Sequence, residues 1–462
     1  MDAFNSGDTA WMLASTALVL FMTPGLAFFY GGMVRSKSVL NMMMMSLSSM
    51  GLVGVLWVLY GYSLAFGNDA GGGLVGNITD YWGLKGLFVG HYVDAADPSA
   101  VSFPLVGSIP ALVFVGFQAT FAIITVALIS GAVADRMKFG AWLLFAGIWA
   151  TVVYFPVAHW VFAFDGVTAE TGGWIANQLK AIDFAGGTAV HINAGVAGLA
   201  LAIVIGKRKG WPREPMRPHN LTLVMLGAGI LWFGWFGFNA GSAVGASGLA
   251  AYAMINTVVA TCAAMLAWLL VERIRDGKAT SLGAASGVVA GLVAITPSCS
   301  SVSPLGAIAV GAIASALCAL AVGLKYRFGY DDSLDVVGVH LVGGLAGTVL
   351  IGFFADPGSG AGVAGLFYGG GADQLWRQVV GALAVLLYSG ILTFVIALIV
   401  KAIFGGKVRV SEEDEVLGID EAEHAETSYD FSSHRGIAGT VGTPRPDAAT
   451  AGAQAVVAGK EG

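Results

Sequence analysis

Two related stretches decide how this sequence is interpreted: Asp183-Phe-Ala-Gly-Gly-Thr-Ala-Val-His191-Ile-Asn-Ala-Gly195 and Asp335-Val-Val-Gly-Val-His340-Leu-Val-Gly-Gly344. Each places a Val-His pair a few residues after an aspartate and ahead of small residues, within a long apolar run. An ionisable side chain at membrane depth is costly, so it usually marks a pathway, a proton relay or a ligand counter-charge. Because the motif occurs twice, we expect a site built from two equivalent halves.

The composition places the chain in a lipid bilayer. Of its 462 residues, 56% are hydrophobic and 11% are charged, and the mean hydropathy is +0.77, which excludes an ordinary soluble protein. The 67 glycines and the lack of an alternating polar face favour closely packed helices over an outer-membrane barrel. We therefore predict an all-α polytopic membrane protein, and the absence of a basic patch excludes nucleic-acid binding.

Eleven stretches without Lys, Arg, Asp or Glu are long enough to span a bilayer. They cover approximately residues 10–34, 40–66, 106–134, 139–164, 184–206, 220–241, 249–271, 280–296, 304–324, 336–355 and 378–400. The long connection 67–105 is rich in glycine and aspartate, and we expect it to be a surface loop beside an outer vestibule.

Basic residues are distributed unequally between the two sets of connecting loops. One set, with the start of the tail, holds seventeen Lys and Arg residues, whereas the opposite set holds only Lys85, Lys180 and Arg377. The positive-inside rule therefore places the N-terminus outside the cell membrane and the C-terminus in the cytoplasm. Residues 1–9 lack the basic start of a signal peptide, so we expect the first helix to be retained.

The order of the predicted helices suggests an internal repeat. Helices one to five can be laid over helices six to ten, which puts His191 in the fifth and His340 in the tenth. An odd number of helices per half inverts the second half, and such inverted five-helix repeats share sites near the membrane midplane. The eleventh helix is left over and is expected to brace the outside.

Three domains follow from the changes in composition. Residues 1–404 form the transmembrane domain, and residues 405–431, which include an acidic stretch, form a cytoplasmic tail with a regulatory role. Residues 432–462 are rich in Gly, Ala, Thr and Pro and lack apolar periodicity, so they are predicted to be disordered.

Two neutral imidazoles can share a hydrogen bond and leave one nitrogen each for a passing ligand. A structural bond to a neighbouring helix is the alternative for one histidine, but the matched pair of His191 and His340 favours function. At about 1.5 Å per residue, His191 lies ~10 Å from the outer start of its helix and His340 ~7 Å from the inner start. In a hydrocarbon core of about 30 Å they meet only if vestibules recess those helix starts.

The two aspartates of the motifs suit helix capping. Asp183 and Asp335 are expected to accept backbone N–H bonds at the starts of the fifth and tenth helices and to complement the helix dipoles. The field of Asp183 would also attract a cation. No metal or cofactor is expected, because the three cysteines lack a metal-site spacing and no further ligand accompanies the histidines.

Aromatic residues gather at three places: Phe117-Gln118-Ala-Thr-Phe121, Trp160-Val-Phe162 and Trp232-Phe-Gly-Trp-Phe-Gly-Phe238-Asn-Ala-Gly-Ser242. Aromatic faces bind small cations, and a serine hydroxyl can accept a hydrogen bond from an N–H donor. For any one of these aromatics taken alone, core packing or a place in the interfacial belt remains the alternative.

At this point the motifs resemble a known family. The two histidine motifs, extended as Asp331-Asp-x-x-Asp335-x-x-Gly-Val-His340, together with Gly234-Trp-Phe-Gly-Phe-Asn-Ala-Gly-Ser242 and Phe117-Gln-x-x-Phe121, resemble the ammonium transporter, methylammonium permease and Rhesus family. The bacterial ammonium transporter branch is the most similar, over about residues 8–431.

The resemblance implies an eleven-helix protomer in a homotrimer, with one pore per subunit. Ser242 would accept from ammonium at an outer site, Phe121 and Phe238 would form the gate, with Phe117 beside them, and His191 and His340 would line the pore. The family usually has Trp at the position of Phe162, so Phe162 or the nearby Trp160 would supply the cation–π face. Asp183 would be the structural acid, and the tail resembles a region that docks PII-type signal proteins.

The sequence therefore predicts transport rather than catalysis. Ammonium, and methylammonium as an analogue, would be recruited outside, deprotonated near the gate and passed as ammonia along the histidines, because an apolar pore penalises an unaccompanied ion by several kcal/mol. The alternative is an ammonium sensor that signals through the tail. A membrane enzyme with a histidine-bound metal is disfavoured by the missing ligands.

Overall fold

Long apolar helices build almost the whole molecule, as the hydropathy pattern predicts. The computed structural model describes residues 4–88, 91–94 and 97–429, so the predicted extension 432–462 lies outside the described residues. Within these residues, ten helices are long and apolar enough to cross a membrane. They are Ser6–Met33, Val39–Phe66, Ala111–Val133, Phe139–Phe162, Gly187–Ile205, Leu221–Gly241, Gly248–Asp276, Pro304–Phe328, Val337–Phe354 and Asp373–Ile403.

An eleventh apolar helix, α10 (Ser281–Ile295), has 15 residues and falls short of a full span. It lies at the place of the eighth predicted segment, and its last turns are buried. The prediction of an all-α polytopic membrane protein is thus confirmed, and the number of helices agrees with the expected eleven once this short helix is included.

Several of the long helices change their winding along their length. The second span consists of α2 (Val39–Leu56), a π-helical turn (Trp57–Gly61) and α3 (Tyr62–Phe66). A π-helical turn (Ala150–Tyr154) likewise interrupts the fourth span. The α-helices of the remaining spans are α1 (Ser6–Met33), α4 (Ala111–Ile129), α5 (Phe139–Trp149), α6 (Phe155–Phe162), α7 (Asn193–Ile205), α8 (Leu221–Gly241), α9 (Gly248–Asp276), α11 (Pro304–Ala321), α12 (Leu324–Phe328), α13 (Val342–Phe354) and α14 (Asp373–Ile403).

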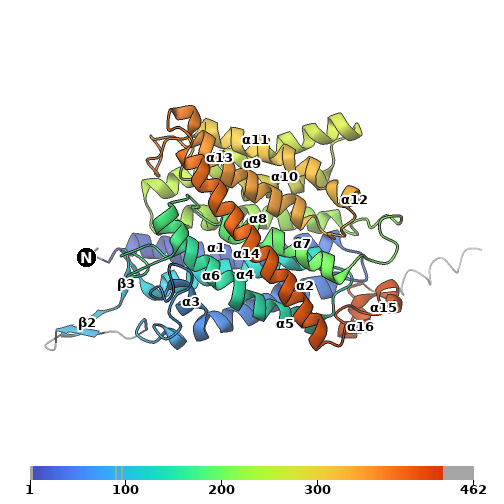
Figure 1. Ribbon diagram of the computed structural model, residues 1–462, viewed down its shortest axis with the longest axis horizontal. Coiled ribbons are helices and arrows are strands. Elements are labelled where there is room, and N and C mark those ends of the chain that lie inside the picture. The colour runs from blue at the N-terminus through green and yellow to red at the C-terminus, as the bar shows by residue number, and fades with distance from the viewer. Residues whose placement is uncertain (1–3, 89–90, 95–96, 430–462) are drawn as a thin grey trace, which may run out of the picture.

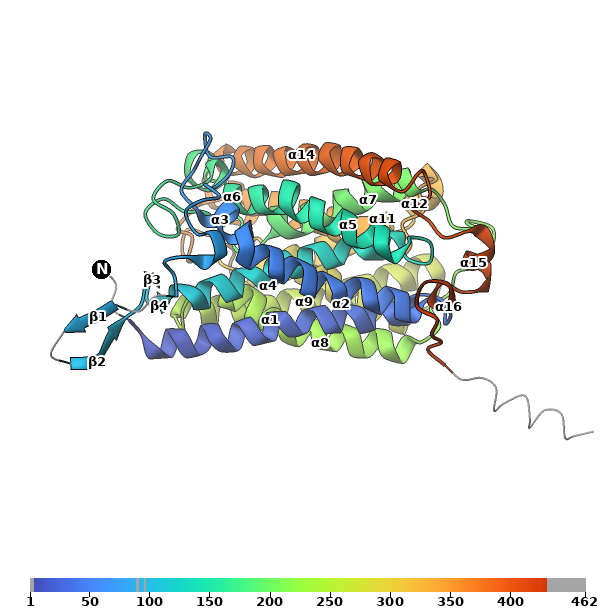
Figure 2. The same cartoon turned by 90° about the horizontal axis from the view of Figure 1, so that it is seen from below.

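The two ends of the bundle differ. At the N-terminal end, loop 67–110 carries two small antiparallel pairs, β1 (His91–Asp94) with β2 (Asp97–Ser102) and β3 (Leu105–Val106) with β4 (Ile109–Pro110). At the opposite end, called the tail end below, α15 (Glu412–Leu417) and α16 (Ile419–His424) lie across the bundle (Figure 2). The seventeen basic loop residues of the sequence pattern belong to the tail end.

Small residues let the helices approach closely, as glycine-rich membrane sequences favour. The first helices of the two halves, α1 and α8, pack along each other, and a Cβ added to Gly227 would lie 2.4 Å from the backbone nitrogen of Phe29. Helix α14 belongs to neither half and lies along the outside against α7 and α13 (Figure 1). It therefore has the bracing position expected for the leftover helix.

Candidate functional site

His191 and His340 meet in the middle of the bundle. Their Nδ1 atoms are 3.3 Å apart, and their rings lie nearly parallel with centroids 5.4 Å apart. Both side chains are buried, and within the described chain the Nε2 atom of His191 has no hydrogen-bond partner. The two imidazoles can thus share one proton between their Nδ1 atoms while the Nε2 atom of His191 stays available to a small polar molecule.

The two histidines meet because two glycines let their helices cross. Gly195 follows His191 by one turn, and a Cβ at Gly195 would lie 2.4 Å from the backbone nitrogen of Leu341. Gly344 follows His340 by one turn, and a Cβ there would lie 3.1 Å from the backbone nitrogen of Ile192. Each glycine therefore touches the residue that follows the opposite histidine, as a two-fold repeat requires.

Both histidine helices begin inside the bundle rather than at its surface. Residues 180–186 before the first one are not helical, and π-helical turns, Gly187–Ile192 and Val337–Leu341, carry the two histidines. Such turns are rare and occur often at functional sites. The recessed starts remove the distance problem posed by ideal helix geometry, since each histidine lies closer to the centre than residue counting from the surface suggests.

Asp183 caps the start of the His191 helix, as predicted. Its carboxylate accepts hydrogen bonds from the amides of Gly186, Gly187, Thr188 and Ala189 at 2.6–3.2 Å, and also from the Thr188 hydroxyl. The side chain is 7% exposed. These hydrogen bonds compensate the burial of the Asp183 carboxylate and fix the backbone at the start of the His191 helix.

The prediction that Asp335 caps the His340 helix is wrong. Asp332 accepts from the amides of Val336 and Val337 at 3.1 and 2.7 Å, whereas Asp335 has a left-handed backbone (φ +63°) and pairs with Lys325 Nζ at 2.7 Å. This stretch contains three aspartates, Asp331, Asp332 and Asp335, and closeness to the histidine does not identify the capping one. The left-handed conformation turns the carboxylate of Asp335 away from the helix start.

Two phenylalanine rings close the path between the histidines and the N-terminal end. Phe121 and Phe238 stack with centroids 4.1 Å apart and an interplanar angle of 19°. Below them, a narrow apolar space of about 10 Å³ runs beside both histidines, roughly the room that one water-sized molecule needs. Trp235 stacks on His191 at 5.5 Å, and its Nε1 donates to the Thr296 hydroxyl, which fixes the ring.

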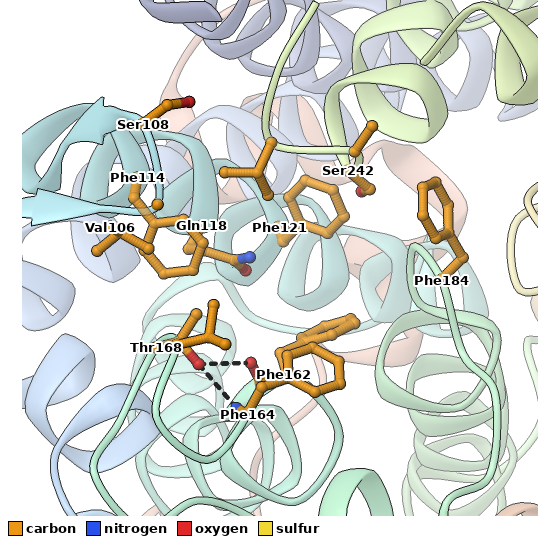
Figure 3. A pocket seen from close by; sticks show the side chains of 14 residues that line it. Val106, Ser108, Phe114, Gln118, Phe121, Phe162, Phe164, Thr168, Phe184 and Ser242 are labelled. Atoms are coloured by element: carbon orange, nitrogen blue, oxygen red, sulfur yellow. Dashed lines mark hydrogen bonds between the residues drawn. The ribbon is translucent and has the colours of Figure 1, made fainter. Parts of the chain in front are cut away.

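A cavity of about 530 Å³, the vestibule, opens above the stacked rings at the N-terminal end. Figure 3 shows Phe121, Phe162, Phe184 and Ser242 among the side chains that line it. The Ser242 hydroxyl donates to the Phe238 carbonyl at 2.8 Å, so its oxygen lone pairs remain able to accept from a ligand. The vestibule thus combines aromatic faces with a few polar atoms, the combination that suits a small cation.

Two of the predicted aromatic residues lie elsewhere. Trp160 does not line the vestibule: its Nε1 donates to the Leu74 carbonyl at 2.7 Å, and its ring packs against Trp174 and Tyr388. The expectation that Trp160 substitutes for a vestibule tryptophan is therefore wrong, and Phe162 is the residue at that place. Phe117 is fully buried, and its ring packs against that of Phe121 with centroids 4.9 Å apart.

The sequence interpretation missed several residues of the site. Phe184, Phe164 and Thr168 line the vestibule, and Thr168 holds its loop by bonds to the backbone of Phe162 and Phe164 (Figure 3). Phe184 was detectable, because it directly follows the capping Asp183. The other two lie in a connection without a recognisable pattern, so only the folded chain brings them to the site.

A third buried histidine was also overlooked. His159 of α6 is fully buried, its Nδ1 lies 2.9 Å from the Ala65 carbonyl, and its Nε2 lies 3.5 Å from an Asp69 oxygen. It joins α6 to the end of α3 and to the loop that follows it. Its contacts are those of a structural brace.

A cluster of buried charges closes the tail end. Arg208 binds Asp331 at 2.8 Å and Asp135 at 3.1 Å, and the Arg136 guanidinium donates to backbone carbonyls, including that of Asp331 at 2.6 Å. Burial lowers the pKa of Arg136 to about 10. Although burial opposes it, Arg208 and Arg136 hold the pKa of Asp331 below its usual value. Arg208 is thus paired with two carboxylates, and Arg136 is bound by backbone carbonyls and the Ser333 hydroxyl.

The tail folds back onto this end. Asp420 accepts from the amides of Leu40 and Asn41 at the start of α2, and Glu423 accepts from the amide of Phe139 at the start of α5. His424 Nε2 lies 3.0 Å from the Asn41 side-chain oxygen. The tail thus contacts two membrane helices directly. Among the described residues, no group of three or more His, Cys, Asp or Glu side chains could hold a metal.

Known proteins match this chain over nearly its whole length. The sequence model of the Ammonium Transporter Family matches residues 10–429. An "Ammonium transporter" of Mycobacterium bovis is 69% identical over 442 residues, which cover 94% of this chain and 92% of that relative. The crystal structure of Saccharomyces cerevisiae Mep2 has a TM-score of 0.80 at 33% identity, covering 96% of this chain and 94% of that one. A structure described as "Sensor Amt Protein" has a TM-score of 0.79 at 26% identity, covering 90% and 98%.

Proposed function

This chain belongs to the ammonium transporter family, and from that premise we propose that it takes up ammonium at the vestibule and passes it as ammonia along the histidine pair. The family and the relatives are transporters or channels rather than enzymes. The observation that carries the proposal is the alignment of three parts: the vestibule, the stacked Phe121 and Phe238 rings, and the paired His191 and His340.

The N-terminal end faces the outside of the cell membrane, and the tail faces the cytoplasm. Support comes from the basic residues, of which the tail end holds the large majority. The vestibule then opens toward the source of ammonium. A cysteine introduced at Ser108, which lines the vestibule, and one introduced at Lys278 at the tail end test this orientation. Labelling of intact cells by an impermeant thiol reagent should reach the first and not the second.

Recruitment rests on the vestibule. The faces of Phe121 and Phe162 attract a small cation, and Ser242 accepts one of its N–H bonds. Phenylalanine is a weaker cation–π partner than tryptophan. Phe162→Trp should therefore increase the apparent affinity for ammonium, and Phe162→Leu should decrease it. An unchanged affinity in both variants would show that Phe162 does not take part in recruitment.

Conduction rests on the apolar space below the gate. An ammonium ion there would have to lose its water without a counter-charge, whereas ammonia needs only hydrogen-bond partners. We place the loss of the proton at the gate, and the Nε2 atom of His191 offers a hydrogen bond to the ammonia that passes. The proton either returns outside or follows through the shared Nδ1 atoms.

Solid-supported-membrane currents on proteoliposomes, recorded together with internal pH, test this mechanism. Ammonium should evoke a current if the proton follows through the histidines, and the double variant His191→Leu, His340→Leu should abolish that current. A wild type that raises internal pH without current moves ammonia alone. Neither current nor pH change in either ammonium or methylammonium would contradict transport itself.

The assembly and its regulation are further parts of the proposal. A homotrimer in the bilayer with one pore per subunit fits the family, and native mass spectrometry should find three copies per particle. A PII-type signal protein is the proposed partner of the tail. Binding of such a protein to the full chain, and its loss when residues 405–462 are deleted, would support that partner.

An ammonium sensor is the second candidate. Two observations favour it: the tail contacts the starts of α2 and α5, and a solved neighbour is described as a sensor. Deletion of residues 405–462 separates the two functions. Unchanged uptake with lost nitrogen signalling would favour the sensor, and impaired uptake would favour a transporter that its tail regulates.

A further inference from the structure

The outward face of α7 borders two adjoining hollows that lie away from the transport path. The first is a groove of about 360 Å³ between α7 and α14, and its lining is entirely apolar. Val196, Ala200 and Ile203 line it from α7, and Gly390, Ile391 and Phe394 line it from α14. Figure 1 shows α7 beside the half of α14 that leads to the tail end. We call this groove the shaft.

The second hollow continues the first toward the tail end. It measures about 570 Å³ and shares Leu199 and Ile203 with the shaft. Leu199 and Ile203 are one turn apart on the same face of α7. Beyond them the hollow is bounded by Lys207, just past the end of α7, and by the segment Phe328–Asp331. The apolar shaft thus leads to a cation at the tail end.

The cation at this end is available to a ligand. Lys207 is exposed, its Nζ lies 5.2 Å over the ring of Trp211, and within the described residues no carboxylate comes within ion-pair distance of it. The one acid that lines the hollow, Asp331, is already engaged by Arg208 at 2.8 and 3.0 Å. A negative group that enters the hollow would therefore meet a positive charge without a competing partner.

Aromatic rings beside Lys207 mark the depth of the lipid headgroups. Trp211 and Tyr326 stack almost parallel, with centroids 5.8 Å apart, and Tyr326 is largely exposed. Tryptophan and tyrosine are enriched at this level of membrane proteins, and lysine reaches it from helix ends. The shaft then lies at the depth of the acyl chains, with Ile203 and Ile391 more than half exposed along it.

We propose that these hollows hold one anionic phospholipid, with its phosphate at Lys207 and one acyl chain in the shaft. Charge complementarity selects the occupant: the shaft leads to Lys207, which has no carboxylate partner among the described residues, and this matches an acyl chain linked to a negatively charged phosphate. A free phosphate ion would leave the shaft unfilled, and a zwitterionic lipid would bring its own cation next to Lys207. The lipid belongs to the leaflet at the tail end, and its binding does not depend on the transport mechanism.

Native mass spectrometry of the intact protein in detergent tests the proposal. Phosphatidylglycerol and phosphatidylcholine with identical acyl chains are titrated in parallel. The wild type should bind the first phosphatidylglycerol more tightly, and Lys207→Gln should reduce that preference by about fivefold, the effect of one lysine near a membrane surface. Lys207→Arg should keep it, because the charge is retained.

Lys278→Gln is the matched control. Lys278 is also an exposed lysine at the tail end, but it lies after α9 and lines neither hollow. An equal loss of preference in Lys278→Gln, or an unchanged preference in Lys207→Gln, would overturn the proposal. Millimolar glycerol phosphate should fail to displace the bound lipid. Displacement would show that the site recognises the phosphate only and that the shaft does not contribute to binding.

Discussion

Asp183 and Asp332 hold the starts of the two histidine helices by the same backbone device. Each stands eight residues before its histidine, and each carboxylate accepts hydrogen bonds from the amides four and five residues further on. Asp183, however, also accepts from two more amides and from a hydroxyl, whereas Asp332 lies near the ion pair of Asp335 with Lys325. The two halves thus share the pair of hydrogen bonds from backbone amides to the aspartate, which we call the anchor, whereas the other groups around the two aspartates differ.

This difference implies that the two halves do not contribute equally to stability. Neutral donors surround the first carboxylate, so its negative charge is well solvated by the protein. Charged neighbours and fewer amides surround the second, and its burial is less well compensated. The predictions below compare the two anchors, beginning with the stronger one.

Asp183→Ala should have the largest effect. It leaves four buried amides without an acceptor, at about 1–3 kcal/mol each, so the loss should exceed about 4 kcal/mol and little folded protein should remain. The yield of monodisperse protein and its thermal unfolding in detergent measure the effect. Asp356→Ala is the control, since Asp356 accepts one exposed amide in a loop. An unchanged melting temperature in Asp183→Ala would show that the cap is dispensable.

Asp332→Ala should cost about half as much, because only two amides lose their acceptor. The expected loss is about 2–6 kcal/mol, at the same ~1–3 kcal/mol for each amide, with measurable but less stable protein and a weakened His191–His340 contact. The same thermal unfolding assay ranks the two variants side by side. If Asp332→Ala proved more damaging than Asp183→Ala, the stronger anchor would lie in the second half.

Asp332, in the second half, should make the stability of the fold depend on pH. Burial raises the pKa of Asp332 to about 6, with Asp335 acting in the same direction and Lys325 against it. A carboxyl group whose folded pKa lies above its unfolded value stabilises the fold when protonated. Its contribution is therefore present below about pH 4 and is lost as the pH rises through about 6, by at most about 3 kcal/mol.

Unfolding at a series of pH values between 4 and 7 reveals this contribution. Asp332→Asn should flatten the decline over that interval, because an amide keeps an acceptor oxygen and does not titrate. A decline of equal slope in Asp332→Asn would assign the pH dependence to another group.

The sequence predicts the helical architecture well, because hydropathy is a strong signal and the predicted spans coincide with the long apolar helices. Motif spacing predicts less. Closeness to His340 favours Asp335 as the second cap, whereas the eight-residue spacing of Asp183 from His191 points to Asp332. The two histidines can meet because their helices start inside the bundle and cross closely at Gly195 and Gly344. Neither feature can be derived from ideal helix geometry. Vestibule residues such as Thr168 come from loops, whose paths depend on tertiary contacts.

Thr188 and Val337 occupy equivalent positions five residues after the two caps. Thr188→Val removes the hydroxyl that donates to Asp183 and makes the first anchor resemble the second. Hydrogen bonds to charged groups contribute about 1.5–3 kcal/mol, and four amides remain here, so we expect a loss near the lower value. Val337→Thr is the reciprocal test, and a gain in thermal stability there would show that the hydroxyl, rather than the site, makes the difference. Loss of stability in both variants would contradict the equivalence.

Asp335→Asn should have the smallest effect of the series. Asp335 pairs with Lys325 at 2.7 Å, but its side chain is 28% exposed, and Lys325 keeps a bond to the Asp332 carbonyl at 3.1 Å. Asparagine tolerates the left-handed backbone of this position, and partly exposed ion pairs contribute about 1 kcal/mol or less. Thermal unfolding should therefore barely change, while Asp332→Ala in the same preparation loses stability. A loss in Asp335→Asn as large as that of Asp332→Ala would mean that the ion pair, and not the two amide bonds, secures the His340 helix, and the structural equivalence of the two anchors would fail with it.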